Sequence, residues 1–442
     1  MNKSQYYVGD FWKMLTNLRD KKISIYTLGC KVNQYESDCM ADALIKEGCI
    51  LSDFESAADI YIINTCAVTN MAEKKSRQII HRARKINPDA LIIACGCYVQ
   101  AQKDALSKDE KIDILVGNNR KKDICRIISE YIDNNTSEDT FIDINKTSEY
   151  ENMTLIKPNE HTRAYVKVQD GCNNFCSYCL IPYTRGRIRS RALNSVVSEV
   201  EGLANNEIKE IVLTGINLSA YMDGDNDLLA LINAVSEIDG IKRIRFGSLE
   251  PRIITDEFLK SISSNEKVCP HFHLSLQSAC NNTLKRMNRR YTIEEYMEKC
   301  DLIRKYYDRP AITTDVIVGF PGETDEDFET TYNNLIKLNL YEMHIFKYSK
   351  RNGTVACSMP NQVSEQTKNT RSDILLDLAA RNKNAFEASF KGEKLKILVE
   401  EILENNGEYT IKGHTDRYVM INEKSSDCAS LKLVNSMYEV NM

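Results

Sequence analysis

The stretch DGCNNFCSYCLIPYTRGRIRSR, Asp170–Arg191, places Cys172, Cys176 and Cys179 within eight residues. Three thiols in so short a segment can bind a metal, but a closed structural zinc site needs four ligands. No further cysteine or histidine follows nearby. The pattern therefore indicates either a metal centre with an open position or a structural zinc knuckle whose fourth ligand is distant in sequence.

The residues around this stretch predict a barrel. Six apolar runs separated by helical spacers begin at Arg163, which is typical of an open (β/α)6 barrel. The cysteine loop follows the first strand directly, at the carboxyl end, where such barrels place their active sites. This position favours the open metal centre. The expected strands are RAYVKVQ (163–169), EIVLTG (210–215), KRIRFGS (242–248), CPHFHLSL (269–276), TTDVIVGF (313–320) and EMHIFKYS (342–349).

A second α/β alternation precedes the barrel and predicts a parallel sheet with helices over 36–46 and 70–85. Its expected strands are ISIYTL (23–28), DIYIIN (59–64), ALIIAC (90–95) and IDILVG (112–117). Cys30, Cys66 and Cys97 each lie at the end of one of the first three strands, so they should converge at one sheet edge. We favour a second iron–sulfur cluster with an open iron over three unrelated buried cysteines. Cys95 is an alternative ligand to Cys97.

Composition divides the chain into segments. We expect an N-terminal domain over 22–135, a polar linker over 136–160, the barrel over 161–364, a connecting helix over 365–390 and a small β-barrel over 391–442. The helix is indicated by ILLDLAARNKNAFEASF (374–390). The last segment contains the expected strands KLKILVEE (394–401), EYTIKGH (408–414), RYVMIN (417–422) and SLKLV (430–434).

Bulk properties limit the function. The 442 residues carry a formal net charge of −5, so a nucleic-acid surface would have to be local. No apolar run is long enough for a membrane span, and the N-terminus lacks an export signal, which predicts a cytoplasmic protein without a membrane partner. In a reducing compartment the 15 cysteines predict metal or catalytic sites rather than disulfides. We expect a structural role for Cys39, Cys49, Cys125, Cys269, Cys280, Cys300, Cys357 and Cys428.

The C-x3-C-x2-C spacing, with Tyr178 before the last cysteine, resembles the radical S-adenosylmethionine signature. More of the chain resembles the methylthiotransferases of that superfamily, in TLGCKVNQYES, NTCAVTNMAEKKSRQ, GCYVQ, LTGINLSAY, SLEP, HFHLSLQS, LKRMNRRY and TTDVIVGFPGETDEDF. The resemblance implies a flavodoxin-like N-terminal domain, a radical S-adenosylmethionine barrel and a C-terminal TRAM-like β-barrel.

The resemblance also implies two [4Fe–4S] clusters and S-adenosylmethionine. Cys172, Cys176 and Cys179 would hold the radical cluster, whose open iron binds S-adenosylmethionine and whose electron cleaves the sulfonium. The auxiliary cluster would be held by Cys30, Cys66 and Cys97. Expected cofactor contacts at strand ends and in the cysteine loop are Tyr178, Thr214, Gly215, Glu250, Gln277 and Asp315, with the VGFPGE turn (318–323) nearby.

Within the family, GCKVNQYES and LTGINLSAY most resemble the branch that adds a methylthio group to C2 of N6-threonylcarbamoyladenosine beside the anticodon of tRNA. Alternatives within the family are the branches acting on isopentenyladenosine or on a ribosomal protein. The resemblance implies tRNA and a reduced flavodoxin or ferredoxin as partners. Two departures are Ala279, where the family has glycine, and an acidic segment 391–442, with seven Lys/Arg against nine Asp/Glu.

Two basic stretches are candidate RNA contacts. Residues 74–85 form an expected helix whose charges are more simply a solvated face. Arg185, Arg187, Arg189 and Arg191 alternate and would share one face of an extended segment. We expect Arg185, Arg187, Arg191 and, in the first motif, Asn33 to contact substrate. The competing class is a zinc-stabilised RNA-binding module without catalysis, which would be colourless where an iron–sulfur protein is brown.

Overall fold

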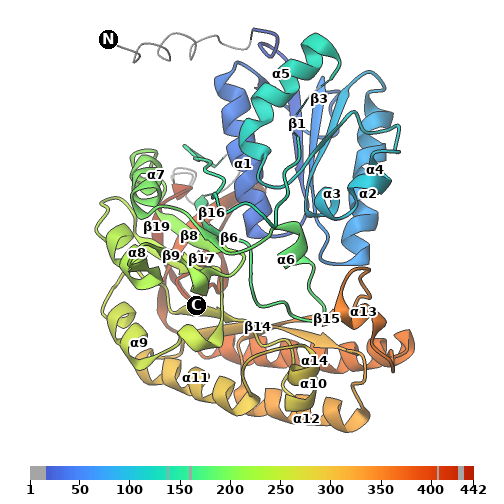
Figure 1. Ribbon diagram of the computed structural model, residues 1–442. Helices are drawn as coiled ribbons and strands as arrows, with labels where there is room; N and C mark the ends of the chain where they lie inside the picture. The colour runs from blue at the N-terminus through green and yellow to red at the C-terminus, as the bar shows by residue number, and fades with distance from the viewer. Residues whose placement is uncertain (1–15, 137, 139, 159–161, 406–407, 427–432) are drawn as a thin grey trace, which may run out of the picture. The chain divides into compact units, whose positions relative to one another are not determined.

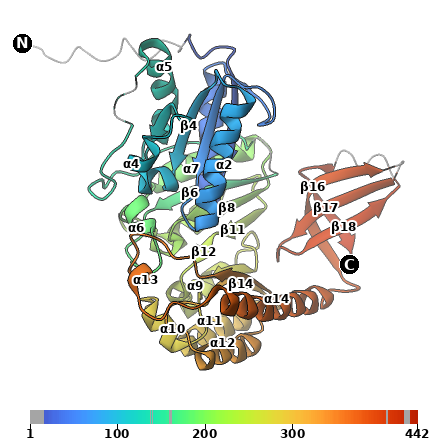
Figure 2. The same cartoon turned by 90° about the vertical axis from the view of Figure 1, so that its right-hand side faces the viewer.

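The computed structural model describes residues 16–136, 138, 140–158, 162–405, 408–426 and 433–442 (Figures 1 and 2). These residues form two compact units. The first comprises the N-terminal residues to Thr147, with Glu151–Thr154 and Tyr183–Arg185. The second contains the remaining residues to the C-terminus. Each unit is described separately below.

The first unit contains a five-stranded parallel sheet in the order β2-β1-β3-β4-β5, the flavodoxin-like order. All six residues of β3 are buried, because helices cover both faces of the sheet. The prediction of a parallel α/β sheet is confirmed. The strands are β1 (Lys22–Thr27), β2 (Ile50–Leu51), β3 (Ile60–Thr65), β4 (Leu91–Gly96) and β5 (Ile114–Val116).

The helices of this unit begin where the sequence supplies caps or strand ends. Thr69 accepts a hydrogen bond from the Ala72 backbone N–H and starts α2. Cys30 is the residue before α1, and Cys97 is the first residue of α3, so both lie at strand-to-helix turns. The helices are α1 (Lys31–Lys46), α2 (Asn70–Ile86), α3 (Cys97–Ala101), α4 (Lys103–Leu106) and α5 (Ile124–Asn134).

The second unit contains the predicted six parallel strands. They form two sheets, β11-β8-β6-β7 and β12-β13-β14-β15, joined by a parallel bridge between Ile244 and Val268. The strands are β6 (Arg163–Asp170), β8 (Glu210–Gly215), β11 (Arg243–Phe246), β13 (His271–Leu274), β14 (Ala311–Val318) and β15 (Glu342–Lys347). The short strands are β7 (Arg189–Ser190), β9 (Met222–Asp223), β10 (Asn226–Asp227) and β12 (Ser248–Leu249).

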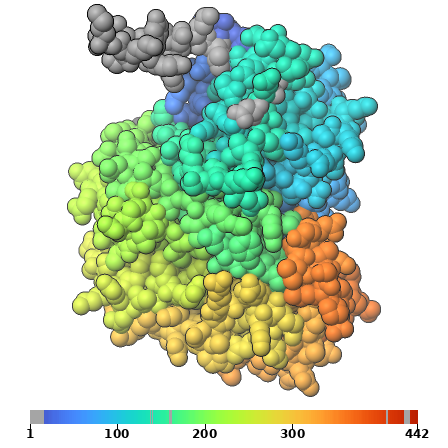
Figure 3. All heavy atoms as spheres, viewed as in Figure 1, coloured from blue at the N-terminus to red at the C-terminus, as the bar shows by residue number. Residues whose placement is uncertain are grey.

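A helix follows each of the six long strands. Thr292 and Thr324 start two of these helices with full capping boxes. The helices are α7 (Leu193–Asn205), α8 (Leu228–Ser236), α9 (Asp256–Ser263), α11 (Ile293–Tyr306), α12 (Asp325–Leu338) and α14 (Glu365–Ala388). Shorter helices are α6 (Ile181–Thr184), α10 (Asn281–Arg286) and α13 (Val355–Ser358). Side chains cover the green and yellow segments continuously in Figure 3, so the gaps between ribbons in Figure 1 are filled.

Helix α14 lies within the segment expected as the connecting helix, 365–390. It starts at Glu365, after Ser364, which caps the helix by accepting from the Thr367 N–H, whereas the apolar run that indicated the helix begins only at Ile374. The first turns are polar, so the cap marks the start and the apolar period does not.

The C-terminal segment is a curled antiparallel sheet in the order β18-β17-β16-β19. Its strands are β16 (Lys394–Asn405), β17 (Glu408–Thr415), β18 (Met420–Ser425) and β19 (Met437–Asn441). The expected fourth strand, SLKLV, is wrong in its described residues Leu433 and Val434, and residues 430–432 lie outside the described residues. The strand is MYEVN, in which only Val440 is buried, so its apolar signal is weak.

This sheet is fastened to the amino ends of the barrel strands by three arginines. Arg163, the first residue of β6, pairs with Glu400 of β16 and with Glu210. Arg243 donates to the Lys396 carbonyl oxygen at 2.6 Å. Arg245 donates to the Asp416 carbonyl oxygen at 2.6 Å and lies over the ring of Tyr418. The sheet is therefore docked at the barrel end opposite the cysteine loop. These contacts are all within the second unit.

The polar segment 136–160, expected as a linker, packs in its described part. Tyr150 donates to the Lys167 carbonyl oxygen at 2.7 Å, and the Tyr35 hydroxyl donates to the Met153 carbonyl oxygen at 2.6 Å. Tyr150, Met153 and Leu155 are buried. Residues 137, 139, 159 and 160 lie outside the described residues. Throughout the described chain, no helix has the length and apolar character to cross a membrane.

Candidate functional site

The cysteine loop starts at the carboxyl end of β6 and is held there by a glycine. Gly171 has φ +73°, and a Cβ at this position would lie 1.9 Å from the Arg187 carbonyl oxygen. Only glycine fits so close to that backbone. The Cys172 N–H then donates to the Gly186 carbonyl oxygen at 3.1 Å. The two ends of the loop are thereby fixed against one another.

Each thiol of the loop accepts an N–H hydrogen bond. The backbone N–H groups of Asn174 and Ile181 approach the sulfurs of Cys172 and Cys179 at 3.5 and 3.4 Å. The Arg289 guanidinium approaches Cys176 Sγ at 3.3 Å. Such donors stabilise a thiolate. Burial and, to a smaller extent, the neighbouring Cys176 raise the pKa of the Cys179 thiol to about 12. Deprotonation of this thiol near neutral pH therefore depends on a bound metal.

Arg289 was not predicted from the sequence as a site residue. Its side chain donates to the Ser275 carbonyl oxygen at 2.9 Å and lies 3.5 Å from Glu250. Glu250 also accepts from the Asn174 amide at 3.1 Å. One buried cation therefore links the loop, strand β13 and the carboxyl end of β12. The basic run LKRMNRRY was the available signal, but its spacing does not say which arginine turns inward.

The expected cofactor contacts lie in different surroundings. Glu250 reaches the cysteine loop, as described, and borders a hollow of about 420 Å³ lined also by Asn173, Asn174 and Asn217. Thr214 and Gly215 end strand β8, and a Cβ on Gly215 would lie 2.9 Å from the Gln169 side chain.

Three other expected contacts make interactions of their own. Tyr178 packs edge-on against Phe320, with ring centroids 6.3 Å apart. Gln277 has φ +72°, and its N–H donates to the Asp315 carbonyl oxygen at 2.9 Å. The Asp315 side chain faces two histidines instead, as described below.

The three cysteines of the first unit converge, as their strand ends predict. A Cβ on Gly29, beside Cys30, would lie 3.0 Å from Cys66 Sγ. Burial, then the neighbouring Cys97 and to a smaller extent Cys30, raises the pKa of Cys66 to about 12. Cys95 is fully buried within β4, paired with Val116 of β5, whereas Cys97 lies beyond the strand.

Neither cysteine triad has the geometry of a single-ion site. A tetrahedral zinc ion with sulfur ligands at about 2.3 Å holds them about 3.8 Å apart. Among the residues that the structure describes, the one group of three or more His, Cys, Asp or Glu ligands with all ligand atoms within 4.8 Å contains no cysteine. The wider spacing fits a cluster, in which each thiolate binds a different iron.

A buried charge network supports the triad of Cys30, Cys66 and Cys97 in the first unit. Glu36, Lys121 and Arg185 have fully buried side chains. Lys121 and Arg185 lie 2.5 and 2.7 Å from the Glu36 carboxylate, and Arg185 donates to Cys97 Sγ at 3.3 Å. Arg185 also donates to Asn33 Oδ1 at 2.7 Å, and Asn33 is buried too. Asn33 and Arg185, expected to contact substrate, thus lie inside the first unit beside the triad.

Replacing Glu36 by glutamine should destabilise the protein by about 3–5 kcal/mol, because it leaves two buried cations without their carboxylate. The measurement is the thermal midpoint and iron content of the cluster-loaded protein under anaerobic conditions. The matched control is Glu55→Gln, whose exposed pair with Arg82 should contribute about 0–1 kcal/mol. Equal midpoints for the two variants would show that the network does not support the fold.

The segment with the four alternating arginines was expected to be extended, with all four on one face, and that expectation is wrong. Only Arg189 and Ser190 are extended, as β7. Arg185, Arg189 and Arg191 are buried, and Arg191 pairs with Glu199. Arg187 is exposed and lies 4.6 Å from the ring centroid of Phe175 in the cysteine loop. In α2, by contrast, Lys74, Lys75 and Lys85 are exposed.

Comparisons with known proteins agree with this geometry. Residues 166–335 match the Radical SAM superfamily, and residues 22–117 match the Uncharacterized protein family UPF0004. The chain is 38% identical to threonylcarbamoyladenosine tRNA methylthiotransferase MtaB of Bacillus subtilis, over 93% of this chain and 92% of that protein. The Aquifex aeolicus protein of the same name is 40% identical, over 86% and 93%.

A relative with another name is also similar. The tRNA-2-methylthio-N(6)-dimethylallyladenosine synthase of Thermodesulfovibrio yellowstonii is 36% identical, over 95% of this chain and 96% of that protein. Among solved structures, the radical S-adenosylmethionine methyltransferase TsrM of Kitasatospora setae has a TM-score of 0.56 at 16% identity, covering 76% of this chain and 77% of that one. This likeness shows the shared fold.

The barrel with its cysteine loop defines a radical S-adenosylmethionine enzyme, whose cofactors are S-adenosylmethionine and [4Fe–4S] iron–sulfur clusters. The sequence identity to the tRNA methylthiotransferases extends over most of this chain and identifies the family within this class of enzymes. The chain belongs to the family of radical S-adenosylmethionine tRNA methylthiotransferases, which use two clusters.

Proposed function

We propose that this protein adds a methylthio group to C2 of N6-threonylcarbamoyladenosine next to the anticodon of tRNA, giving 2-methylthio-N6-threonylcarbamoyladenosine. One S-adenosylmethionine is the methyl donor and another is the radical source. The observation that carries the proposal is the pair of cysteine triads, each at the carboxyl ends of parallel strands in its own unit. The relatives named for this nucleoside, at 38–40% identity, support the choice of substrate.

Cys172, Cys176 and Cys179 hold the radical cluster in this proposal, and Cys30, Cys66 and Cys97 hold the auxiliary one. Both sets fit the group: three thiols, N–H donors aimed at sulfur, and a spacing too wide for one ion. When bound, a cluster with an open iron supplies the electron that cleaves S-adenosylmethionine.

The chain's own residues orient and enclose that chemistry. Arg289 donates a charged hydrogen bond to Cys176 Sγ, and Arg185 donates one to Cys97 Sγ, each at 3.3 Å. These bonds fix the position of one sulfur in each triad. The polar hollow beside Glu250 suits the ribose or amino-acid groups of S-adenosylmethionine. Thr214 and Gly215 end strand β8, which pairs with β11 in the same sheet.

The partners follow from the proposed reaction. A tRNA substrate places the enzyme in the cytoplasm, and the electron is supplied by a reduced flavodoxin or ferredoxin. In this proposal the C-terminal sheet is a TRAM-like module. Its nine acidic residues against seven basic ones favour tRNA phosphate contacts elsewhere, on exposed cations such as Arg187 and the lysines of α2.

The test is nucleoside mass spectrometry of tRNA from a strain lacking the gene. The 2-methylthio-N6-threonylcarbamoyladenosine signal should disappear, its unmethylthiolated precursor should accumulate, and a plasmid copy should restore the product. A specific second candidate is the dimethylallyladenosine substrate, which the 36% identical relative favours. Loss of the methylthiolated dimethylallyl nucleoside, with the threonylcarbamoyl product unchanged, would select that candidate.

Arg187→Ala should weaken tRNA binding and reduce the log–log salt slope by roughly one, because one phosphate contact is lost. Binding is measured as a function of salt concentration with the cluster-loaded enzyme. The control is Arg381→Ala, also exposed but on α14 and paired with Asp377. A slope equal to that of the parent protein would assign Arg187 to packing on Phe175 only.

A further inference from the structure

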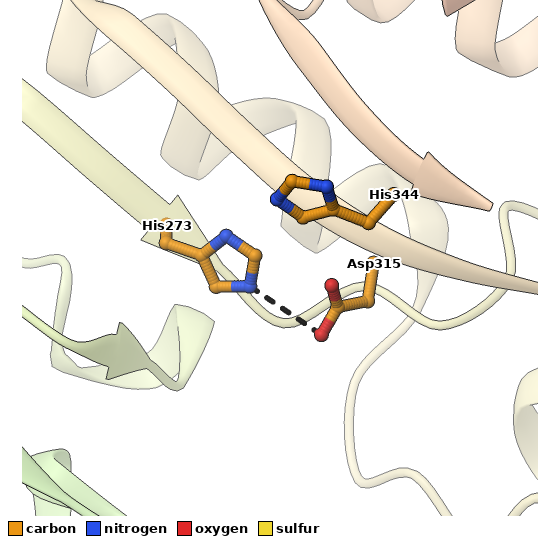
Figure 4. A group of neighbouring side chains, drawn as sticks. All are labelled: His273, Asp315 and His344. Carbon is orange, nitrogen blue, oxygen red and sulfur yellow. Dashed lines mark ion pairs between the residues drawn. The ribbon is translucent and has the colours of Figure 1, made fainter. Parts of the chain in front are cut away.

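Two histidines and an aspartate meet on three adjacent strands of the barrel (Figure 4). His273 is on β13, Asp315 on β14 and His344 on β15. Asp315 is the register partner of His344, and His273 is the partner of Thr313, two residues before Asp315. Alternate residues of a strand share a face, so the three side chains lie on the same side of the sheet. Their ligand atoms all lie within 4.8 Å of one another.

The imidazole of His273 is oriented by a second interaction. Its Nδ1 lies 2.9 Å from Thr313 Oγ1, and its Nε2 lies 3.4 Å from Asp315 Oδ2. Histidines that bind metals usually have the other ring nitrogen fixed in this way. The rings of His273 and His344 are near-parallel, with centroids 5.8 Å apart and an interplanar angle of 29°. Both imidazoles therefore border the same space next to the carboxylate.

The spacing and exposure fit an ion with open coordination positions. Nitrogen and oxygen ligands at about 2.0–2.1 Å from a tetrahedral ion lie about 3.4 Å apart, which is the His273–Asp315 contact already present. The side chains of His273 and Asp315 are 13% and 29% exposed, so a ligand can reach them. Three protein ligands with solvent access are typical of a catalytic or substrate-binding metal, since structural zinc sites are closed by four.

We propose that His273, Asp315 and His344 bind one divalent transition-metal ion of the zinc class. Two imidazoles and one carboxylate suit zinc and its first-row neighbours, whereas magnesium and calcium prefer oxygen ligands alone. The site uses none of the residues of either cysteine triad. It is connected to the radical site through β13: Ser275, two residues after His273, accepts a hydrogen bond from Arg289. The remaining positions are free for an oxygen donor, such as a carboxylate.

The test uses the cluster-loaded enzyme, treated anaerobically with EDTA, desalted and titrated with zinc chloride by calorimetry, with zinc and iron counted by mass spectrometry. We expect one zinc per chain without loss of iron. Asp315→Asn and His344→Gln, which keep side-chain size, should each weaken zinc affinity at least about tenfold at constant iron content. The matched control is His81→Gln, in an exposed histidine–aspartate pair 3.0 Å apart in the first unit.

Three results would overturn the proposal. The first is equal zinc affinity in the parent and both variants. The second is no zinc binding to the parent beyond the signal of a protein-free blank. The third is zinc uptake that displaces iron, which would place the zinc at the cysteines. The iron count and the circular dichroism spectrum separate loss of the site from loss of folding. Because metal binding is measured without tRNA, the outcome is independent of the proposed nucleoside substrate.

Discussion

The Cys66→Ala enzyme should still cleave S-adenosylmethionine to 5′-deoxyadenosine but should form no methylthiolated nucleoside. In the proposed assignment Cys66 holds the auxiliary cluster, in a unit separate from Cys172, Cys176 and Cys179. The substitution leaves that loop and Arg289 untouched, whereas the sulfur-donating site loses one of its three ligands. No cysteine triad other than the radical one is assigned among the described residues of the barrel, so the effect on product should be complete.

The measurement is an anaerobic assay with dithionite and threonylcarbamoylated tRNA that scores both products in one reaction. Cys125→Ala is the matched control, since Cys125 lies in α5 of the same unit and outside the triad. Methylthiolated nucleoside from the Cys66 variant would make the N-terminal cysteines structural. Loss of both products in a folded, iron-loaded variant would show instead that the two sites are coupled.

Cys176→Ala should have a broader effect and abolish both products, while the auxiliary cluster stays in place. Cys176 Sγ accepts a hydrogen bond from the Arg289 guanidinium, and its loss leaves the radical cluster with two ligands. Iron should fall from about eight to about four per chain, as expected for one cubane of two. The control is Cys357→Ala, whose sulfur lies 3.6 Å from the Asn352 side chain in the same unit and outside the cysteine loop. Complete loss of iron would show that the six cysteines do not divide into two independent sets.

The strand pattern was largely readable from the sequence because parallel strands buried on both faces are continuous apolar runs. Runs such as EIVLTG therefore match their strands in the structure. The edge strand β19 was missed because it buries little apolar surface. The polar segment 136–160 was misleading for a related reason. Several of its apolar residues, including Ile144, Tyr150, Met153 and Leu155, are buried.

The candidate site was readable only where chain position fixes spatial position. Cysteines at strand ends must meet at one edge, so Cys30, Cys66 and Cys97 could be grouped. The roles of the arginines could not be derived, because alternation implies a shared face only in a strand, and β7 is two residues long. The Glu36–Lys121–Arg185 network and the His273–Asp315–His344 group depend on pairing between distant segments, which no local spacing encodes.

Arginine side chains of the barrel bind the C-terminal sheet, and this affects how truncated variants can be interpreted. Arg163, Arg243 and Arg245 are largely buried, and many of the groups that accept their hydrogen bonds belong to the sheet. Removing residues 391–442 would strip these partners from three guanidinium groups at once, and each buried donor left unsatisfied costs about 1–3 kcal/mol. The sheet and barrel should therefore melt in a single cooperative transition. A shortened enzyme that no longer binds tRNA would report on a damaged barrel as much as on a missing RNA contact, so point substitutions on the outer surface of the sheet are the cleaner test.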